Sequence, residues 1–199
     1  MAGMDALELL RADHDTVREL FQRFKSAKDD GDTRQMSQLK EQIFSELRVH
    51  TSIEEEIFYP AAEDVGEEAE ELVKEGVEEH HVVDVLMGEI EDLNPSEDAW
   101  SAKMTVLIEN VEHHAEEEEE ELFPQLRETF GDERLVDLGG QLQEAKARHK
   151  AVAAGRSGTG SQEASAMTKE DLYERAKEQD VEGRSQMTKE ELAEAVEDS

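Results

Sequence analysis

Histidine and glutamate residues recur in this 199-residue chain at spacings that could place them on shared helix faces. A histidine with a glutamate four residues later occurs twice, as His50 with Glu54 and as His114 with Glu118. Residues four apart lie one above the other on an α-helix, so each pair would present an imidazole and a carboxylate together. Both groups are ligands of iron, manganese and zinc, so the pattern indicates a metal site.

An internal duplication supplies two more histidines. Pro60 and Pro124 each follow a histidine by ten residues, which aligns the two copies and selects His114 over its neighbour His113. In the segment before each copy, a histidine stands ahead of a similar apolar pattern. These two histidines are His14 and His80.

Four long amphipathic helices are predicted from the apolar spacing. They cover residues 5–28, 33–59, 67–93 and 97–128. Short connections join the first helix to the second and the third to the fourth, so each pair forms an antiparallel hairpin. A shorter fifth helix is predicted over 132–152. The expected fold class is therefore all-α, with a bundle of four helices and a short fifth helix.

The histidines and glutamates are expected to meet at one level inside this bundle, because the histidines lie at similar depths from one end at about 1.5 Å per residue. Burying unpaired charges is costly. Two divalent metal ions would remove that cost, with both carboxylates as bridges and each histidine bound to one ion. Iron suits such mixed ligation, and manganese or zinc is less favoured. The predicted metal ligands are His14, His50, Glu54, His80, His114 and Glu118.

Other polar residues near these positions are assigned to the surface or to the edge of the site. They are His81, His113, His149, Glu55 and Glu119. Tyr59 is expected to pack in the core, although its hydroxyl could reach the site.

The order of these motifs resembles the hemerythrin-like, or HHE-type, cation-binding domain over about residues 5–150. The first and third helices carry a histidine, and the second and fourth carry His-x3-Glu, followed by Phe-Tyr-Pro and Leu-Phe-Pro. The resemblance implies an up-down-up-down bundle. It also implies two iron ions with an oxo or hydroxo bridge, in a non-haem centre that meets oxygen, peroxide or nitric oxide.

Two features depart from the oxygen-carrying members of that family. They place a second histidine four residues after the one on the third helix, where this chain has Asp84. They also tend to use His-x4-Asp on the fourth helix, where this chain has His-x3-Glu. The resemblance then implies an open coordination position or one filled by Asp84, and it favours peroxide chemistry or sensing over oxygen carriage. The sequence leaves open whether Asp84, His81 or His113 joins the ligands.

Composition limits the other possibilities. A net charge of −32 argues against binding nucleic acid or an anionic membrane. The absence of cysteine excludes disulfides and cysteine-bound clusters. No apolar run reaches the ~20 residues that cross a bilayer, and the N-terminus lacks the pattern of a signal peptide. A cytoplasmic location is therefore expected.

The C-terminal part contains a second repeat. Residues 154–166 are rich in small polar residues and are predicted to form a flexible linker. A Met-Thr-Lys-Glu sequence then recurs at 167 and 187, and residues 167–199 resemble the helix–extended–helix module of the Rho termination factor N-terminal region. That resemblance suggests nucleic-acid binding, but 12 acidic against 5 basic residues in 161–199 favour docking to a protein partner. The expected domains are a bundle over 1–153, the linker, and a small helical module over 167–199.

The sequence thus predicts a cytoplasmic, non-haem di-iron protein that binds, senses or reacts with oxygen or peroxide. Its ligand would be a small diatomic molecule or a peroxide, and catalase- or peroxidase-like turnover is one form of such reactivity. The alternative is an iron-dependent regulatory module without turnover, whose C-terminal module docks a protein partner.

Overall fold

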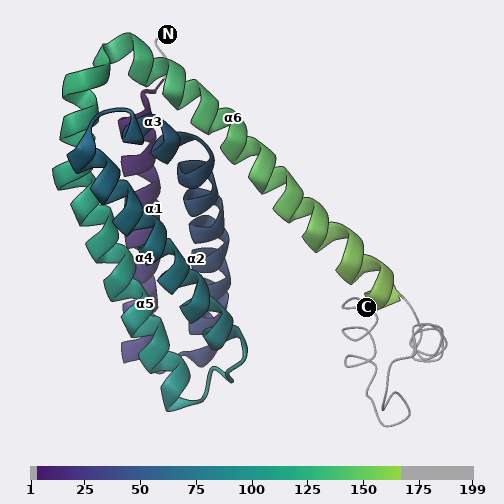
Figure 1. The fold of residues 1–199 in the computed structure, drawn as a ribbon. Helices are drawn as coiled ribbons and strands as arrows, with labels where there is room; N and C mark the ends of the chain where they lie inside the picture. The colour runs from purple at the N-terminus through teal and green to yellow at the C-terminus, as the bar shows by residue number, and fades with distance from the viewer. Residues whose placement is uncertain (1–3, 167–199) are drawn as a thin grey trace. The chain divides into compact units, whose positions relative to one another are not determined.

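The computed structural model describes residues 4–166, and the side chains of residues 4–152, as helices and short connections without strands (Figure 1). The all-helical prediction is confirmed for this part of the chain. The elements are α1 (Ala6–Asp29), α2 (Thr33–Ile53), the π-helix η1 (Glu54–Phe58), α3 (Tyr59–Glu63), α4 (Glu67–Glu91), α5 (Asp98–Glu117), the π-helix η2 (Glu118–Leu122) and α6 (Phe123–Ala166).

Two compact units divide the chain, over residues 1–148 and 149–199. Residues 149–166 of the second unit are helical, as the last part of α6. The predicted linker over 154–166 is therefore helical in the structure. The predicted Rho-like module at 167–199 lies outside the described residues, and the domain boundaries stay a prediction.

The two helices of the first hairpin begin within one residue of their predicted starts, and a side chain caps each of them. Asp5 and Glu8 form a reciprocal capping box at the start of α1. Asp32 accepts a hydrogen bond from the backbone N–H of Gln35 at the start of α2, and Gly31 makes the turn with φ of 70°. Helices α1, α2, α4 and α5 then lie side by side as two antiparallel hairpins (Figure 1).

The helix that follows the bundle differs from the predicted short fifth helix. α6 bends at Gly131, where φ is 67° and ψ is 170°, and it continues as one element to Ala166 instead of ending near residue 152. The bend fits glycine because other residues rarely adopt a positive φ.

A π-helix interrupts the chain near the end of the second and of the fourth predicted long helix, shortly before Pro60 and Pro124. In η1 the backbone N–H of Tyr59 donates to the carbonyl of Glu54, and in η2 that of Phe123 donates to Glu118. The helix continues past Pro60 to Glu63, so the proline does not end the helix, and the wide turn lies just before it. Single π turns of this kind are rare and occur frequently at functional sites.

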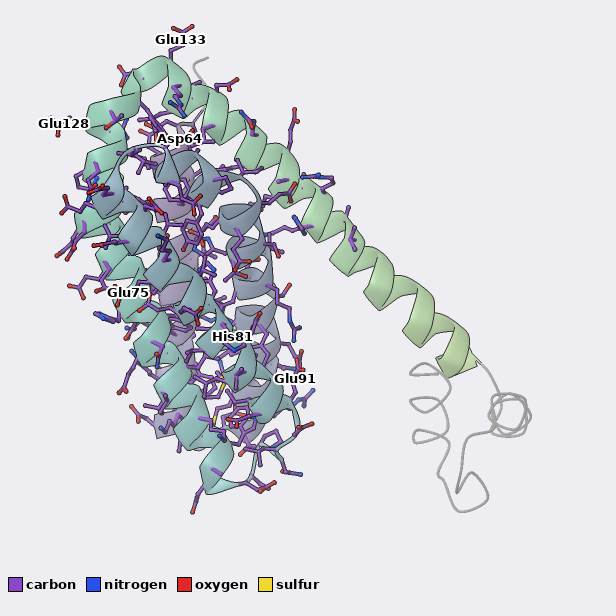
Figure 2. All side chains as sticks on the ribbon, viewed as in Figure 1. Asp64, Glu75, His81, Glu91, Glu128 and Glu133 are labelled. Atoms are coloured by element: carbon purple, nitrogen blue, oxygen red, sulfur yellow. The ribbon has the colours of Figure 1, made fainter. Side chains whose placement is uncertain are left out.

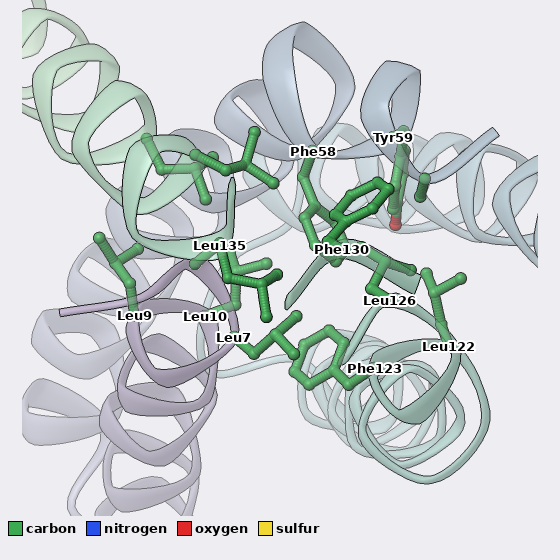
Figure 3. Close-up of a cluster of buried hydrophobic side chains, with 14 of the residues drawn as sticks. Leu7, Leu9, Leu10, Phe58, Tyr59, Leu122, Phe123, Leu126, Phe130 and Leu135 are labelled. Atoms are coloured by element: carbon green, nitrogen blue, oxygen red, sulfur yellow. The ribbon is translucent and has the colours of Figure 1, made fainter. Parts of the chain in front are cut away.

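Two buried apolar clusters fill the bundle, one toward each end. Figure 3 shows the cluster at the end where α1 starts, which includes Phe58, Phe123 and Leu126 and is completed by Leu135 of α6. The other cluster contains Phe21, Phe44 and Trp100. Acidic side chains such as Glu75, Glu91 and Glu128 are exposed and project from the helices in Figure 2. The level between the two clusters contains the histidines.

Gly139 of α6 is expected to be required for the packing of α6 on the start of α1. A Cβ at Gly139 would press on the carbonyl oxygen of Met4 and lie 2.8 Å from the carbonyl carbon of Asp5. Both are backbone atoms, so Gly139→Ala should lower the free energy of unfolding by about 1–3 kcal/mol, as overpacking does. Chemical denaturation of the purified variants measures the change.

The adjacent Gly140→Ala is the matched control. Nothing lies within 4 Å of a Cβ at that position. Since alanine favours a helix over glycine, this variant should be about 0.5–1 kcal/mol more stable than the wild type. Equal effects of the two substitutions would contradict the close packing of α6.

Candidate metal centre

Six buried polar side chains meet between the two apolar clusters, with exposed fractions of 6% or less. Each hairpin contributes three of them in the same order. The first hairpin supplies His14 from α1, His50 from the last turn of α2 and Glu54 from the start of η1, and the second supplies His80 from α4, His114 from the last turn of α5 and Glu118 from the start of η2. The structure therefore brings together all six residues that the spacing selected.

The histidines form two pairs, one within each hairpin. The Nε2 atoms of His14 and His50 lie 3.0 Å apart, and those of His80 and His114 lie 3.1 Å apart. Two nitrogens that each lie ~2.1 Å from one metal ion, at roughly a right angle, would be separated by about 3.0 Å. Both pairs therefore have a spacing that suits two ligands of a common ion.

Each glutamate reaches both histidine pairs. Glu54 Oε1 lies 3.1 Å from His50 Nε2, and Glu54 Oε2 lies 3.5 Å from His80 Nε2. Glu118 Oε2 lies 3.3 Å from His14 Nε2, and Glu118 Oε1 lies 3.8 Å from His114 Nε2. One oxygen of each carboxylate thus faces each pair, as a bridge between two ions requires.

Two potential cation positions follow from these distances. Nitrogen and oxygen atoms within 4.8 Å of one another form one group from His14, His50, Glu54 and Glu118, and a second from Glu54, His80 and His114. Neither oxygen of Glu54 and only one of Glu118 has a hydrogen-bond partner among the described residues. Buried carboxylate oxygens without partners are costly, and a bound cation would satisfy them.

A second layer of carboxylates holds the outer nitrogen of three histidines and approaches that of the fourth. Glu119 lies 2.8 Å from Nδ1 of His14, Glu55 lies 2.9 Å from that of His80, and Glu79 lies 2.7 Å from that of His114. Asp13 Oδ2 is 3.8 Å from Nδ1 of His50 and makes no hydrogen bond there. A carboxylate that accepts from Nδ1–H leaves the lone pair of Nε2 facing inward, as metal-binding histidines require.

The sequence predicts two of these outer carboxylates only at the surface or the edge of the site, and it does not indicate the other two. Glu55 and Glu119 are predicted to lie at the surface or at the edge of the site, and each directly follows one of the two inner glutamates. Asp13 and Glu79 were not selected, although each directly precedes a histidine of the site. The duplication contains the signal that could have found them, because the acidic neighbours recur at the same positions in both copies.

Burial and mutual repulsion oppose the ionisation of both inner carboxylates at once. Burial raises the pKa of Glu54 well above its usual value, and the negative charge of Glu118 raises it further. Burial also acts against ionisation of Glu118, but His114 and His14 outweigh it and hold that pKa below its usual value. Metal ions are the usual means of removing such repulsion inside a protein.

The pKa values of two of the histidines are shifted in opposite directions. Burial disfavours protonation of His14, but Glu118 and Glu119 outweigh it and raise its pKa to about 9. Burial and the neighbouring His114 lower the pKa of His80 to about 3. Opposed shifts within a few ångströms are typical of functional sites.

Tyr59 lies inside the second half of the site. Its hydroxyl donates to Glu118 Oε1 at 3.0 Å and lies 3.3 Å from His80 Nε2 and 3.4 Å from His114 Nε2. The duplication places Phe123 at the matching position in the first half, where its ring stacks on His14 at a centroid distance of 6.1 Å. At this position the two halves therefore differ by one hydroxyl group.

A small apolar hollow of about 20 Å³ adjoins the histidines on the other side. Its walls include Val17, Phe21, Leu47 and Val83. A space of this size is comparable to that occupied by one water molecule.

Several residues considered in the sequence do not join the inner group. His81 and Asp84 are exposed, and neither they nor His149 belong to a potential metal-binding group of the described residues. His113 is 64% exposed and belongs to a separate group with Glu79 and Glu117.

Comparisons with known proteins agree with this geometry. A DNA nickase from Nostoc sp. is 24% identical over 145 residues, which span 73% of this chain and 40% of the nickase. An uncharacterized hemerythrin-like protein from Schizosaccharomyces pombe is 26% identical over 135 residues, or 67% of this chain and 65% of that protein. The chain thus matches less than two thirds of the length of either relative, and no solved structure matches it significantly. The family model described as the hemerythrin HHE cation binding domain matches residues 5–126, so the chain belongs to this family.

Proposed function

We propose that this chain holds two iron ions between its four bundle helices and that the centre binds, senses or reacts with oxygen or peroxide. The observation that carries the proposal is the placement of Glu54 and Glu118, each with one oxygen toward the histidine pair of each hairpin. His14 and His50 would bind one ion, His80 and His114 the other, and the two carboxylates would bridge them.

Iron fits the donor set better than the alternatives. The site offers four imidazoles and two carboxylates and no sulfur, and such mixed ligation with open positions suits iron more than manganese or zinc. Bound iron would supply redox chemistry and an open position for a small ligand. The apolar hollow beside the histidines would admit such a ligand, and the carboxylates on Nδ1 would keep the imidazoles oriented.

The exposed position of Asp84 bears on which reaction is favoured. Oxygen-carrying relatives have a fifth histidine where this chain has Asp84, and Asp84 lies on the surface of α4. The centre would therefore have fewer protein ligands than an oxygen carrier. This supports reaction with peroxide, or sensing, over storage of oxygen.

A regulatory role without turnover is the second candidate. The matched region is only 40% of the length of the DNA nickase, so a domain of this kind also occurs as one part of a larger protein. In such a role, iron would stabilise the bundle and a partner protein would detect its state.

Iron content and optical absorption test the proposal directly. The aerobically purified full-length protein should contain about two iron ions per chain, as di-iron bundle proteins do. It should also show near-ultraviolet and visible bands that d¹⁰ zinc cannot give. Removing the metal with a chelator should lower the melting temperature, because buried carboxylates then lose their partner. A chain that binds no iron, with a melting temperature unchanged by chelation, would contradict the proposal.

Gas evolution from peroxide separates the two candidate functions. Catalase-type turnover by the iron-loaded protein would support reactivity, and iron-dependent melting without turnover would support regulation.

His80 and His81 offer a matched pair of substitutions on α4. His80→Ala removes a buried Nε2 atom from the second cation position and should lower the iron content to about one ion per chain or fewer. His81→Ala removes an exposed imidazole and should leave the content unchanged. Elemental analysis of both variants checks this, and iron loss from both would argue against the assigned ligands.

A further inference from the structure

A second, outer group of metal-binding side chains lies on the surface next to the buried site. Glu79 of α4 and His113 and Glu117 of α5 each offer one ligand atom, and these atoms lie within 4.8 Å of one another. His113 Nε2 is 3.5 Å from Glu117 Oε1, one helical turn away. The side chains of His113 and Glu117 are 64% and 31% exposed, so this group faces solvent.

The outer group is linked to the buried site by contact and by space. Glu79 belongs to both, because its Oε2 atom lies 2.7 Å from Nδ1 of His114. A hollow of about 10 Å³ separates the two groups, with Glu79 and Glu117 on its outer side and Tyr59, His114 and Glu118 on its inner side. A volume of this size is about that of one water molecule.

Gly76 keeps this hollow open. A Cβ at position 76 would lie 2.8 Å from the Tyr59 hydroxyl and 3.3 Å from Cε1 of His114. At the inner end lies Glu118, which is 5% exposed and whose Oε1 atom accepts from the Tyr59 hydroxyl on the side of the hollow. Its Oε2 atom, which has no hydrogen-bond partner among the described residues, faces His14 in the other half. The hollow thus leads from a solvent-facing group of side chains to the buried carboxylate of Glu118, which reaches both histidine pairs.

In the part of the chain that the structure describes, the other half of the duplicated bundle has no such outer group. Its residues at the positions of His113 and Glu117 are Val49 and Ile53, which are both buried. The residue at the position of Glu79 is Asp13, which pairs with Lys146 of α6. The position of Gly76 is taken by Leu10, which is fully buried. Among the described residues, a solvent-facing group of potential ligands beside a hollow is therefore found in one half only.

We propose that Glu79, His113 and Glu117 form an outer, transient binding site for a divalent metal ion, which passes through the hollow at Gly76 into the buried centre. This inference rests on the proposed function, since it needs a centre to be filled. Three ligands at an exposed position bind a divalent ion weakly, which suits transit. The mixed imidazole and carboxylate set matches the metals that the centre would accept.

The rate at which metal enters the empty protein tests this inference. Metal-free, full-length protein is mixed with Co²⁺, whose absorption reports coordination by imidazole and carboxylate, and the approach to saturation is followed by stopped flow. The double variant His113→Ala/Glu117→Gln removes two outer ligands and keeps all six inner ones. It should fill about tenfold more slowly, within the range by which charged clefts raise association rates, and should reach the same final content and spectrum.

The control is the double variant His81→Ala/Asp84→Asn. It also removes one exposed imidazole and one exposed carboxylate, so it changes the net charge by the same amount. It should fill at the wild-type rate. Wild-type filling by the outer-group variant, or equal slowing of both variants, would overturn the outer site while leaving the proposed centre intact. If the wild type takes up no Co²⁺ at all, the proposed centre itself fails.

Direct occupancy gives a second measurement. When zinc-loaded protein is titrated with Mn²⁺, the imidazole proton signals of His113 should broaden before those of His81. Equal broadening of the two would also overturn the outer site.

Discussion

The fold must offset the free-energy cost of burying two carboxylates and four imidazoles between two apolar clusters. Glu54 is fully buried, and both of its oxygens lack hydrogen-bond partners within the described part of the chain. A buried carboxylate without partners either takes up a proton and becomes neutral, or acquires a partner of opposite charge. The proposed pair of metal ions would meet that need for both carboxylates at once. The carboxylates on the outer nitrogens of the histidines would orient the imidazoles toward such a pair.

Duplication explains how each of the two hairpins supplies one histidine pair and one carboxylate to the site. The two hairpins place their histidine pairs at nearly the same separation, 3.0 and 3.1 Å, and each sends one glutamate across to the other pair. The copies then differ where their surroundings differ. α6 covers the first half, where Val49 and Ile53 are apolar, and the second half faces solvent, where His113 and Glu117 are polar. Exposure alone accounts for polarity at these positions, but it does not account for their convergence with Glu79 on a hollow that Gly76 keeps open.

Much of the inner site could be predicted from sequence because its residues obey the helical repeat. His50 and Glu54 are four apart, and the prolines fix the alignment of the two copies, so the six inner residues could be selected without coordinates. The contacts between helices could not be selected this way. Glu79 meets His114 across α4 and α5, and Glu119 meets His14 across η2 and α1, and such pairs depend on how the helices are rotated against one another. Segment 154–166 is a different case, because its small polar composition resembles a linker while the structure continues α6 through it.

The position of Tyr59 shows why a regular helical period is insufficient at this site. In a regular α-helix, a residue five positions after Glu54 is rotated by about 140° from it, away from the interior face. The π-helix η1 takes in one additional residue per turn, and the N–H of Tyr59 donates to the carbonyl of Glu54. Glu54 and Tyr59 therefore come onto one face, and the hydroxyl reaches Glu118. Pro60 lowers the cost of this wide turn, since proline has no N–H to donate to the preceding turn in any case. The same turn at Glu118 brings Phe123 toward His14. The prolines that align the two copies in the sequence thus follow the turns that aim an aromatic ring at each half of the centre.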